Sequence, residues 1–187
     1  ELGLPQDVPV VGFVGRFHPQ KDMALFFHAA RSAQEKVPSL HLVVCGGRES
    51  DLYPEAREAF STLPRPEQVR FVPFMQETER LYPAFTFLAL TSATEAFPNV
   101  VLEAMACGVP VVTTAAGDAR AIVADAGRVV ELHDRQGMVH AWLETLSLPP
   151  ADREAQVRRG RTRAEQEYTM ERAAQRFIEV YEEVAAS

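Results

Sequence analysis

The stretch Val8-Pro9-Val10-Val11-Gly12-Phe13-Val14-Gly15-Arg16 decides the fold of this chain of 187 residues. Its valine-rich run, Val8 to Val14, is typical of a β-strand that is buried on both faces, and a glycine follows it. Further runs of the same character occupy residues 41–45, 69–72, 86–90, 109–113 and 128–130. The sequence therefore predicts about six strands.

Helical patterns separate these strands. Residues 23–36 carry apolar side chains at the spacing of one helix face, and residues 51–60, 77–82 and 99–107 are shorter versions. The last third predicts helices only, at 138–146, 152–167 and 170–185. Alternating strands and helices favour a Rossmann-like α/β fold, in which helices flank a parallel sheet. Ligands of such sheets bind at the carboxyl ends of the strands.

Length and composition favour one ordinary globular domain. The apolar share is 47% and the charged share 24%, and the longest uncharged stretches are shorter than the roughly 20 residues of a membrane-spanning helix. A net charge of −7 argues against bulk binding to nucleic acid. Two cysteines without zinc spacing favour a reducing compartment, hence the cytoplasm, and no metal. Since no initiator Met or leader precedes Glu1, we expect a piece of a longer protein.

The loop after the first strand, Gly15-Arg16-Phe17-His18-Pro19-Gln20-Lys21, places two cations where this fold takes ligands. Arg16 offers a bidentate fork and Lys21 a movable point charge, a combination suited to a diphosphate. On this loop alone, two solvated charges are the commoner interpretation. Asp22 is the expected cap of the helix that follows.

A second constellation, Thr94 to Glu103, follows the fourth strand. Pro98 suits the first position of a helix, whose free N–H groups would make a second anion site. Glu95 would stand just outside this helix and Glu103 just inside it. A carboxylate in an otherwise apolar helix needs solvent or hydrogen-bond donors, and vicinal sugar hydroxyls would supply two. A plain solvent-facing Glu103 is the alternative.

Together these stretches carry a family resemblance. Glu95-x7-Glu103 with Phe97-Pro98 inside it, followed by Ala104-Met105-Ala106-Cys107-Gly108-Val109-Pro110, resembles the signature of family 4 retaining glycosyltransferases of the GT-B fold, the glycosyl transferases group 1. Gly15-Arg16-x4-Lys21 matches that family's other donor-site motif. The resemblance covers essentially the whole chain. The chain is similar to the C-terminal, nucleotide-sugar-binding half of such an enzyme. It implies one donor-binding domain over 1–187, with a crossover helix at 169–187, and an absent N-terminal acceptor domain.

The resemblance also implies roles. Arg16, Lys21 and Glu95 would be catalytic: the cations hold the donor's diphosphate, and Glu95 lies against the donor sugar. Glu103 would accept from the ribose hydroxyls, and the loop after the third strand would contact the base. The implied donor site comprises Gly15, Arg16, Lys21, Gly46, Phe74, Met75, Glu95, Phe97, Pro98, Asn99, Val100 and Glu103. No metal or other cofactor is expected, because two cations and a helix amino end replace the divalent ion.

Three departures from the family pattern affect this site. Ala96 and Asp22 stand where the family usually has glycine, so the backbone has less freedom there. The turn Gly46-Gly47-Arg48-Glu49-Ser50 also differs from the common Gly-x-Gly-Pro form. These changes leave the base and the donor sugar open.

The sequence thus predicts the donor-binding domain of a retaining, metal-independent, hexosyltransferase-like enzyme that moves a sugar from a nucleoside diphosphate to an unknown acceptor. The piece alone would be inactive. A sugar-nucleotide epimerase of the same fold and a non-catalytic nucleotide-sugar-binding module are the alternatives. A nicotinamide-dependent dehydrogenase fits poorly, since the first loop lacks Gly-x-Gly-x-x-Gly. The missing half could contact the inner face of a membrane, and the apolar face of residues 170–184 could support self-association.

Overall fold

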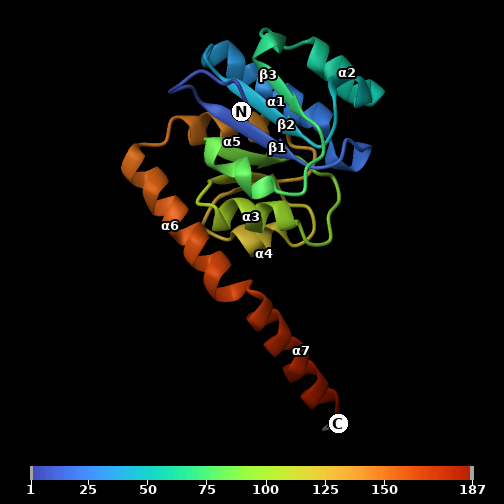
Figure 1. Ribbon diagram of the computed structural model, residues 1–187, viewed down its shortest axis with the longest axis vertical. Coiled ribbons are helices and arrows are strands. Elements are labelled where there is room, and N and C mark those ends of the chain that lie inside the picture. The colour runs from blue at the N-terminus through green and yellow to red at the C-terminus, as the bar shows by residue number, and fades with distance from the viewer. Residues whose placement is uncertain (1, 186–187) are drawn as a thin grey trace.

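The computed structural model describes residues 2–185, which contain one six-stranded sheet (Figure 1). The strand order is β3-β2-β1-β4-β5-β6, and every neighbouring pair is parallel. This is the order of a doubly wound Rossmann-like sheet, in which successive strands are added outward on one side of β1 and then, from β4, on the other side. The strands are β1 Val10–Val14, β2 His41–Cys45, β3 Val69–Val72, β4 Phe87–Leu90, β5 Val111–Thr114 and β6 Arg128–Val130. The predicted fold class is confirmed.

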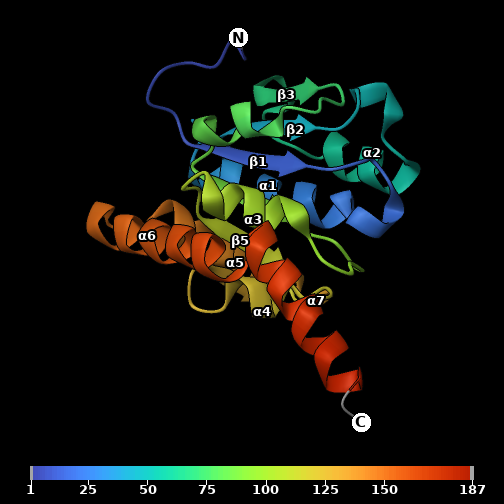
Figure 2. The same cartoon turned by 60° about the horizontal axis from the view of Figure 1, so that its bottom comes forward.

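Helices cover both faces of the sheet (Figure 2). Buried residues of α1, α2 and α5 form a cluster on one face, and those of α3, α4 and α6 form a cluster on the other. The helices are α1 Met23–Lys36, α2 Pro54–Ser61, α3 Asn99–Ala106, α4 Ala119–Val123, α5 Arg135–Leu146, α6 Pro150–Glu167 and α7 Met170–Ala185. Each face therefore has its own apolar core.

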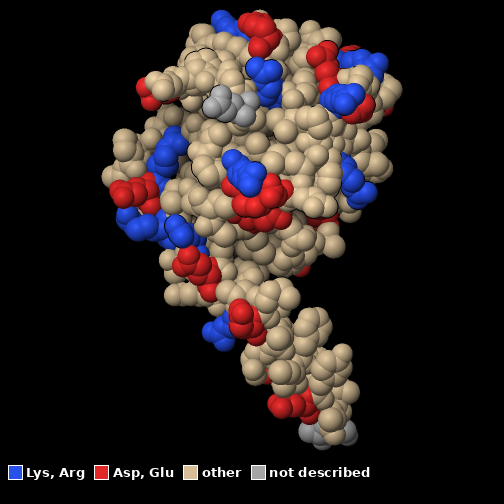
Figure 3. Space-filling model, viewed as in Figure 1, with Lys and Arg blue, Asp and Glu red and all other residues tan. Residues whose placement is uncertain are grey.

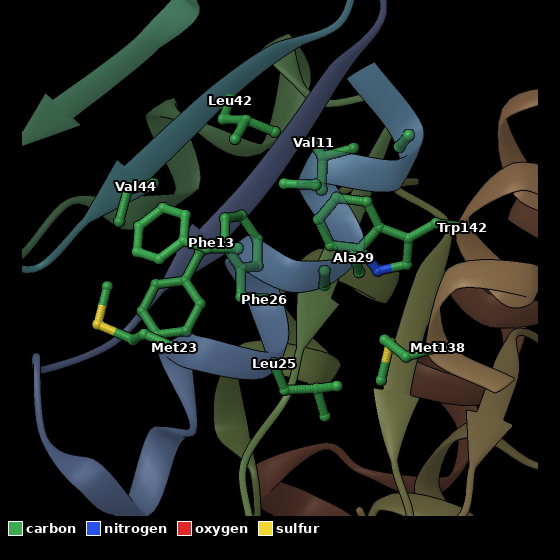
Figure 4. Packing of buried hydrophobic residues seen from close by; sticks show 14 of the residues in the cluster. Val11, Phe13, Met23, Leu25, Phe26, Ala29, Leu42, Val44, Met138 and Trp142 are labelled. Atoms are coloured by element: carbon green, nitrogen blue, oxygen red, sulfur yellow. The ribbon is translucent and has the colours of Figure 1, made fainter. Parts of the chain in front are cut away.

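Strand β1 joins the two cores. Val11 and Phe13 face the α1 side, whereas Val10 and Val14 face the α3 side, as the alternation of a strand requires. On the α1 side, Trp142 is fully buried and packs edge-to-face on Phe26 (centroids 5.1 Å apart) and on Phe87 (5.4 Å). Figure 4 shows Phe13, Phe26 and Trp142 in this core. The valine-rich run thus decides the fold because its alternate side chains fill both layers.

Two helix predictions need correction, and one helix was not predicted. The segment predicted as a helix at 77–82 instead begins two short 3-10 turns, Thr78–Arg80 and Tyr82–Ala84, because Pro83 has no N–H to continue an α-helix there. Helix α4, only five residues long, was too short for periodicity to show. Helix α5 begins at Arg135 rather than after Gly137, because the Asp134 carboxylate accepts from the Gly137 N–H (2.8 Å) and caps the helix.

Helix α7 extends away from the body of the domain (Figure 1). None of its residues is buried, and even the apolar side chains of Phe177, Tyr181 and Val184 expose 66%, 71% and 69% of their surface. Figure 3 shows acidic and basic side chains interspersed over one face of the body. Among residues 2–185 no helix combines the length and apolarity needed to cross a membrane.

Candidate functional site

The carboxyl ends of β1, β2 and β3 meet at one edge of the sheet. The Gly15 N–H donates to the Cys45 carbonyl (2.9 Å), and the Gly46 N–H donates to the Val72 carbonyl (2.9 Å). These bonds bring three loops together around a pocket of about 470 Å³. Its lining is Val14, Gly15, Arg16, Lys21, Cys45, Gly46, Phe74, Met75, Gln76, Thr78, Val100 and Glu103.

Glycine is required at position 46 because two loops touch there. Gly46 has φ of +134°, and a Cβ atom on it would overlap the Gly15 carbonyl oxygen and lie 2.7 Å from the Gly15 carbonyl carbon. Both atoms belong to the backbone, so a side chain could enter only if the Gly15-Arg16 loop moved. Gly46 therefore sets the position of Arg16 in the pocket.

Lys21 and Glu95 form an ion pair beside this pocket. The Lys21 Nζ atom lies 2.5 Å from the Glu95 Oε1 atom, and the side chains are only 19% and 11% exposed. The buried Ser92 hydroxyl donates to the same carboxylate oxygen (2.6 Å). Glu95 is thus held against the cation that the sequence assigned to a diphosphate.

Backbone and amide bonds brace the two loops that carry this pair. The Thr91 hydroxyl donates to the Lys21 carbonyl (3.0 Å), and the Ala93 N–H donates to the Gln20 carbonyl (2.9 Å). The Gln20 side-chain amide donates to the Thr94 carbonyl (2.8 Å). These bonds join segments that are 70 or more residues apart in the chain, so the pairing of Lys21 with Glu95 is built into the fold.

The amino end of α3 opens toward the pocket at Val100. The helix begins at Asn99, and Pro98 is its N-cap residue rather than its first helical residue as predicted. The Val101 N–H donates to the Pro98 carbonyl (3.0 Å), while the Asn99 and Val100 N–H groups have no acceptor among the described residues. Such free N–H groups, with the helix dipole, favour an anion at this end.

Glu103 lies in the second turn of α3 and lines the pocket. Its Oε2 atom accepts two hydrogen bonds, from the Tyr82 hydroxyl (2.6 Å) and from the Thr78 hydroxyl (3.1 Å). Burial and the contact with Glu103 raise the pKa of Tyr82, so the phenol stays protonated and donates. The hydroxyls of Tyr82 and Thr78 therefore supply two of the donors that a carboxylate in this apolar helix needs.

The structure brings most, but not all, of the predicted site residues together. Eight of them line the pocket: Gly15, Arg16, Lys21, Gly46, Phe74, Met75, Val100 and Glu103. Glu95 does not line the pocket, but it forms an ion pair with Lys21, which does. Pro98 is buried, and Phe97 and Asn99 line a separate groove against α7 instead. The functional roles assigned to all twelve remain predictions.

The sequence did not predict four polar residues that support this set, namely Ser92, Thr78, Tyr82 and Gln20. Ser92 lies three residues from its partner Glu95, whereas the partners of the other three are 21 to 74 residues away. One signal was available: a carboxylate in an apolar helix requires donors, and hydroxyl side chains flank the third and fourth strands.

Two of the three departures have a local explanation. Asp22 adopts the left-handed conformation (φ +41°) that glycine usually takes, and its carboxylate accepts from the Leu25 N–H (3.0 Å), which caps α1 as predicted. Ala96 is exposed and is not among the described non-glycine residues with positive φ, so its conformation does not require glycine; its carbonyl accepts from the Asp118 N–H (3.1 Å). Among the described residues, no group of three or more His, Cys, Asp or Glu side chains is placed to hold a metal.

Fold and site together define a Rossmann-like α/β domain with an anion-favouring pocket at the carboxyl edge of its sheet. A model of the family Glycosyl transferases group 1 matches residues 8–147. The chain belongs to this family, which confirms the resemblance seen in the sequence; the family 4 subtype stays a prediction.

Relatives and solved structures agree with this assignment. The D-inositol 3-phosphate glycosyltransferase of Salinispora tropica is 34% identical over 198 aligned residues, covering 99% of this chain and 40% of that protein. Sucrose-phosphate synthase from Thermosynechococcus elongatus has a TM-score of 0.80 at 26% identity, covering 100% of this chain and 48% of the other. HepE of Anabaena, solved in complex with UDP-glucose, has a TM-score of 0.80 at 23% identity, covering 95% and 49%. The chain thus spans less than half the length of these proteins.

Proposed function

We propose that this chain is the nucleotide-sugar donor-binding domain of a retaining, metal-independent glycosyltransferase. The observation that carries the proposal is one pocket that combines Arg16, Lys21, the amino end of α3 and the Glu103 carboxylate. Two cations and free helix N–H groups suit a diphosphate, and a carboxylate suits the hydroxyls of a ribose. The proposal keeps the roles that the resemblance implied for these residues.

Within this proposal the donor lies across the pocket from Glu103 to Glu95. The ribose is at Glu103, the diphosphate is between Arg16, Lys21 and the α3 amides, and the sugar extends toward Glu95. Phe74, 72% exposed beside Met75 at the edge of the pocket, offers an apolar surface to the base. As the bond to the sugar breaks, Arg16 and Lys21 stabilise the charge that builds on the departing diphosphate.

The acceptor domain is proposed to lie outside this chain, in a cytoplasmic enzyme. The chain covers 40% of the Salinispora tropica relative, which leaves room for a second half there. The uncovered apolar face of α7 fits a crossover toward such a half, and in its absence the same face supports self-association. A domain that holds only the donor binds nucleotide sugar without turnover.

Calorimetry tests the donor-binding proposal. We expect one of UDP, GDP and ADP to bind, and to bind with unchanged affinity when EDTA is present, because the cationic groups of the pocket come from the protein. Absence of binding by all three nucleotides would overturn the proposal. Loss of binding on chelation would overturn its metal-independent part.

Replacing Glu95 by Gln tests the ion pair with Lys21. In the unliganded chain Glu95 neutralises the cation that the diphosphate needs, while a Gln oxygen can still accept from Ser92. We expect Glu95→Gln to bind the nucleoside diphosphate about three- to tenfold more tightly, corresponding to ~1 kcal/mol for the released charge. The matched control is Glu35→Gln, which removes the exposed pair with Arg31 on α1 and should leave the affinity unchanged. A weaker diphosphate complex in Glu95→Gln would contradict this role of Lys21.

A further inference from the structure

We propose that Tyr82 and Thr78 are positioning residues that fix the Glu103 carboxylate so that its Oε1 atom accepts hydrogen bonds from two vicinal hydroxyls of the ligand. Both side chains donate to the other oxygen, Oε2, at 2.6 and 3.1 Å. This inference rests on the proposed function, because it concerns the group in the pocket that would contact the ribose of the donor.

The Glu103 carboxylate has acceptor sites left over for a ligand. An ionised carboxylate has two oxygens with about four lone-pair sites in all. Two hydroxyl donors occupy the sites of Glu103 Oε2, whereas Oε1 has no donor among residues 2–185. Two sites therefore remain on the oxygen that is free, and a pair of neighbouring hydroxyls matches them in number.

The side chain of Tyr82 is held rigidly by its neighbours. Tyr82 is 0% exposed, and its ring packs edge-to-face on Phe85 with centroids 5.9 Å apart. Phe85 in turn fits against Gly12, in the middle of β1, where any Cβ atom would overlap its ring. The phenol is thus fixed to the centre of the sheet, and a short charge-assisted bond transmits that position to Glu103. A glutamate in solvent would instead lose rotamer freedom when the ligand bound.

The positions of Thr78 and Tyr82 in the fold also suit this role. Thr78 and Glu103 both line the pocket together with Arg16 and Lys21. Thr78 and Tyr82 belong to the two 3-10 turns that stand where the sequence predicted a helix. The two turns meet at Leu81, and their two hydroxyls converge on one carboxylate oxygen.

The test compares each of UDP, GDP and ADP with its 2′,3′-dideoxy analogue by calorimetry. Wild-type protein should prefer the ribonucleotide that binds by about tenfold or more, as expected for hydroxyl bonds to a charged acceptor. Tyr82→Phe should reduce that preference to about threefold or less, while its affinity for the dideoxy analogue stays within about twofold of wild type. Thr78→Val should reduce the preference in the same direction, by a smaller factor.

The matched control is Tyr53→Phe. The Tyr53 hydroxyl also makes one internal hydrogen bond, accepting from the Met23 N–H (2.8 Å), but it lies outside the pocket lining. Its removal should leave the preference for ribose unchanged. If Tyr82→Phe fails to fold, Thr78→Val alone decides.

The outcomes separate the two proposals. A folded Tyr82→Phe protein with the full wild-type preference would overturn the positioning role and leave donor binding intact. Equal binding of ribo- and dideoxynucleotides by wild type would also overturn it, because Glu103 would then not read the hydroxyls. Absence of binding by every nucleotide would overturn the proposed function itself.

Discussion

Gly46→Ala should lose nucleotide affinity at least about a hundredfold while the chain still folds. The new Cβ would overlap the Gly15 carbonyl, so the loop that carries Arg16 has to move away from the pocket. The residue would also keep a strained positive φ, which costs about 1 to 3 kcal/mol of stability. Calorimetry with the nucleotide that wild type binds measures the first effect, and thermal unfolding measures the second.

Gly108→Ala is the matched control for this substitution. Gly108 also has a positive φ (+74°), but the nearest atom to a Cβ there is the side-chain atom Val157 Cγ1 at 3.4 Å, so no backbone atom would be overlapped. It should show a comparable loss of stability and keep wild-type affinity. If Gly46→Ala bound nucleotide as well as Gly108→Ala does, the first loop would not be part of the site.

Arg16→Ala should weaken nucleoside diphosphate binding by about 2 kcal/mol, roughly thirtyfold, because a charge-assisted contact with the diphosphate is lost. Arg16 is exposed and lines the pocket, so its removal should leave stability nearly unchanged. The effect should be much smaller for the corresponding nucleoside, which has no phosphate. Calorimetry with both ligands measures the difference.

The control for Arg16 is Arg48→Ala. Arg48 is exposed in the turn after Gly46 and carries the same charge, but it does not line the pocket. It should change affinity by less than about threefold, the scale of a screened surface charge. Equal losses in both variants would show that general electrostatics, rather than a contact of Arg16, attracts the ligand.

The sheet could be predicted from the sequence because strands that are buried on both faces appear as nearly continuous apolar runs. The valine-rich run around Phe13 and the run at 41–45 each contribute side chains to both cores. The segment around Pro83 was misjudged as a helix, since apolar spacing outweighed the effect of a single proline. Short helix α4 has too few residues for a period to appear.

The site could be predicted only in part, for a similar reason. Gly15, Arg16 and Lys21 share one loop, and the sheet topology places that loop beside α3, so their meeting with Glu103 followed from topology. The pairing of Tyr82 with Glu103 depends on the turns around Pro83, and that of Lys21 with Glu95 on two braced loops. Neither pairing can be predicted from neighbouring residues, although the apolar surroundings of Glu103 in the sequence indicate that it needs donors.

The most direct test of the donor site is an experimental structure of this chain with its bound nucleoside diphosphate. We expect phosphate oxygens within about 3.2 Å of the Arg16 guanidinium, of Lys21 Nζ and of an N–H in the first turn of α3. We also expect the ribose hydroxyls at Glu103 Oε1. A nucleotide seated elsewhere, or one whose phosphates point away from these three groups, would contradict this placement.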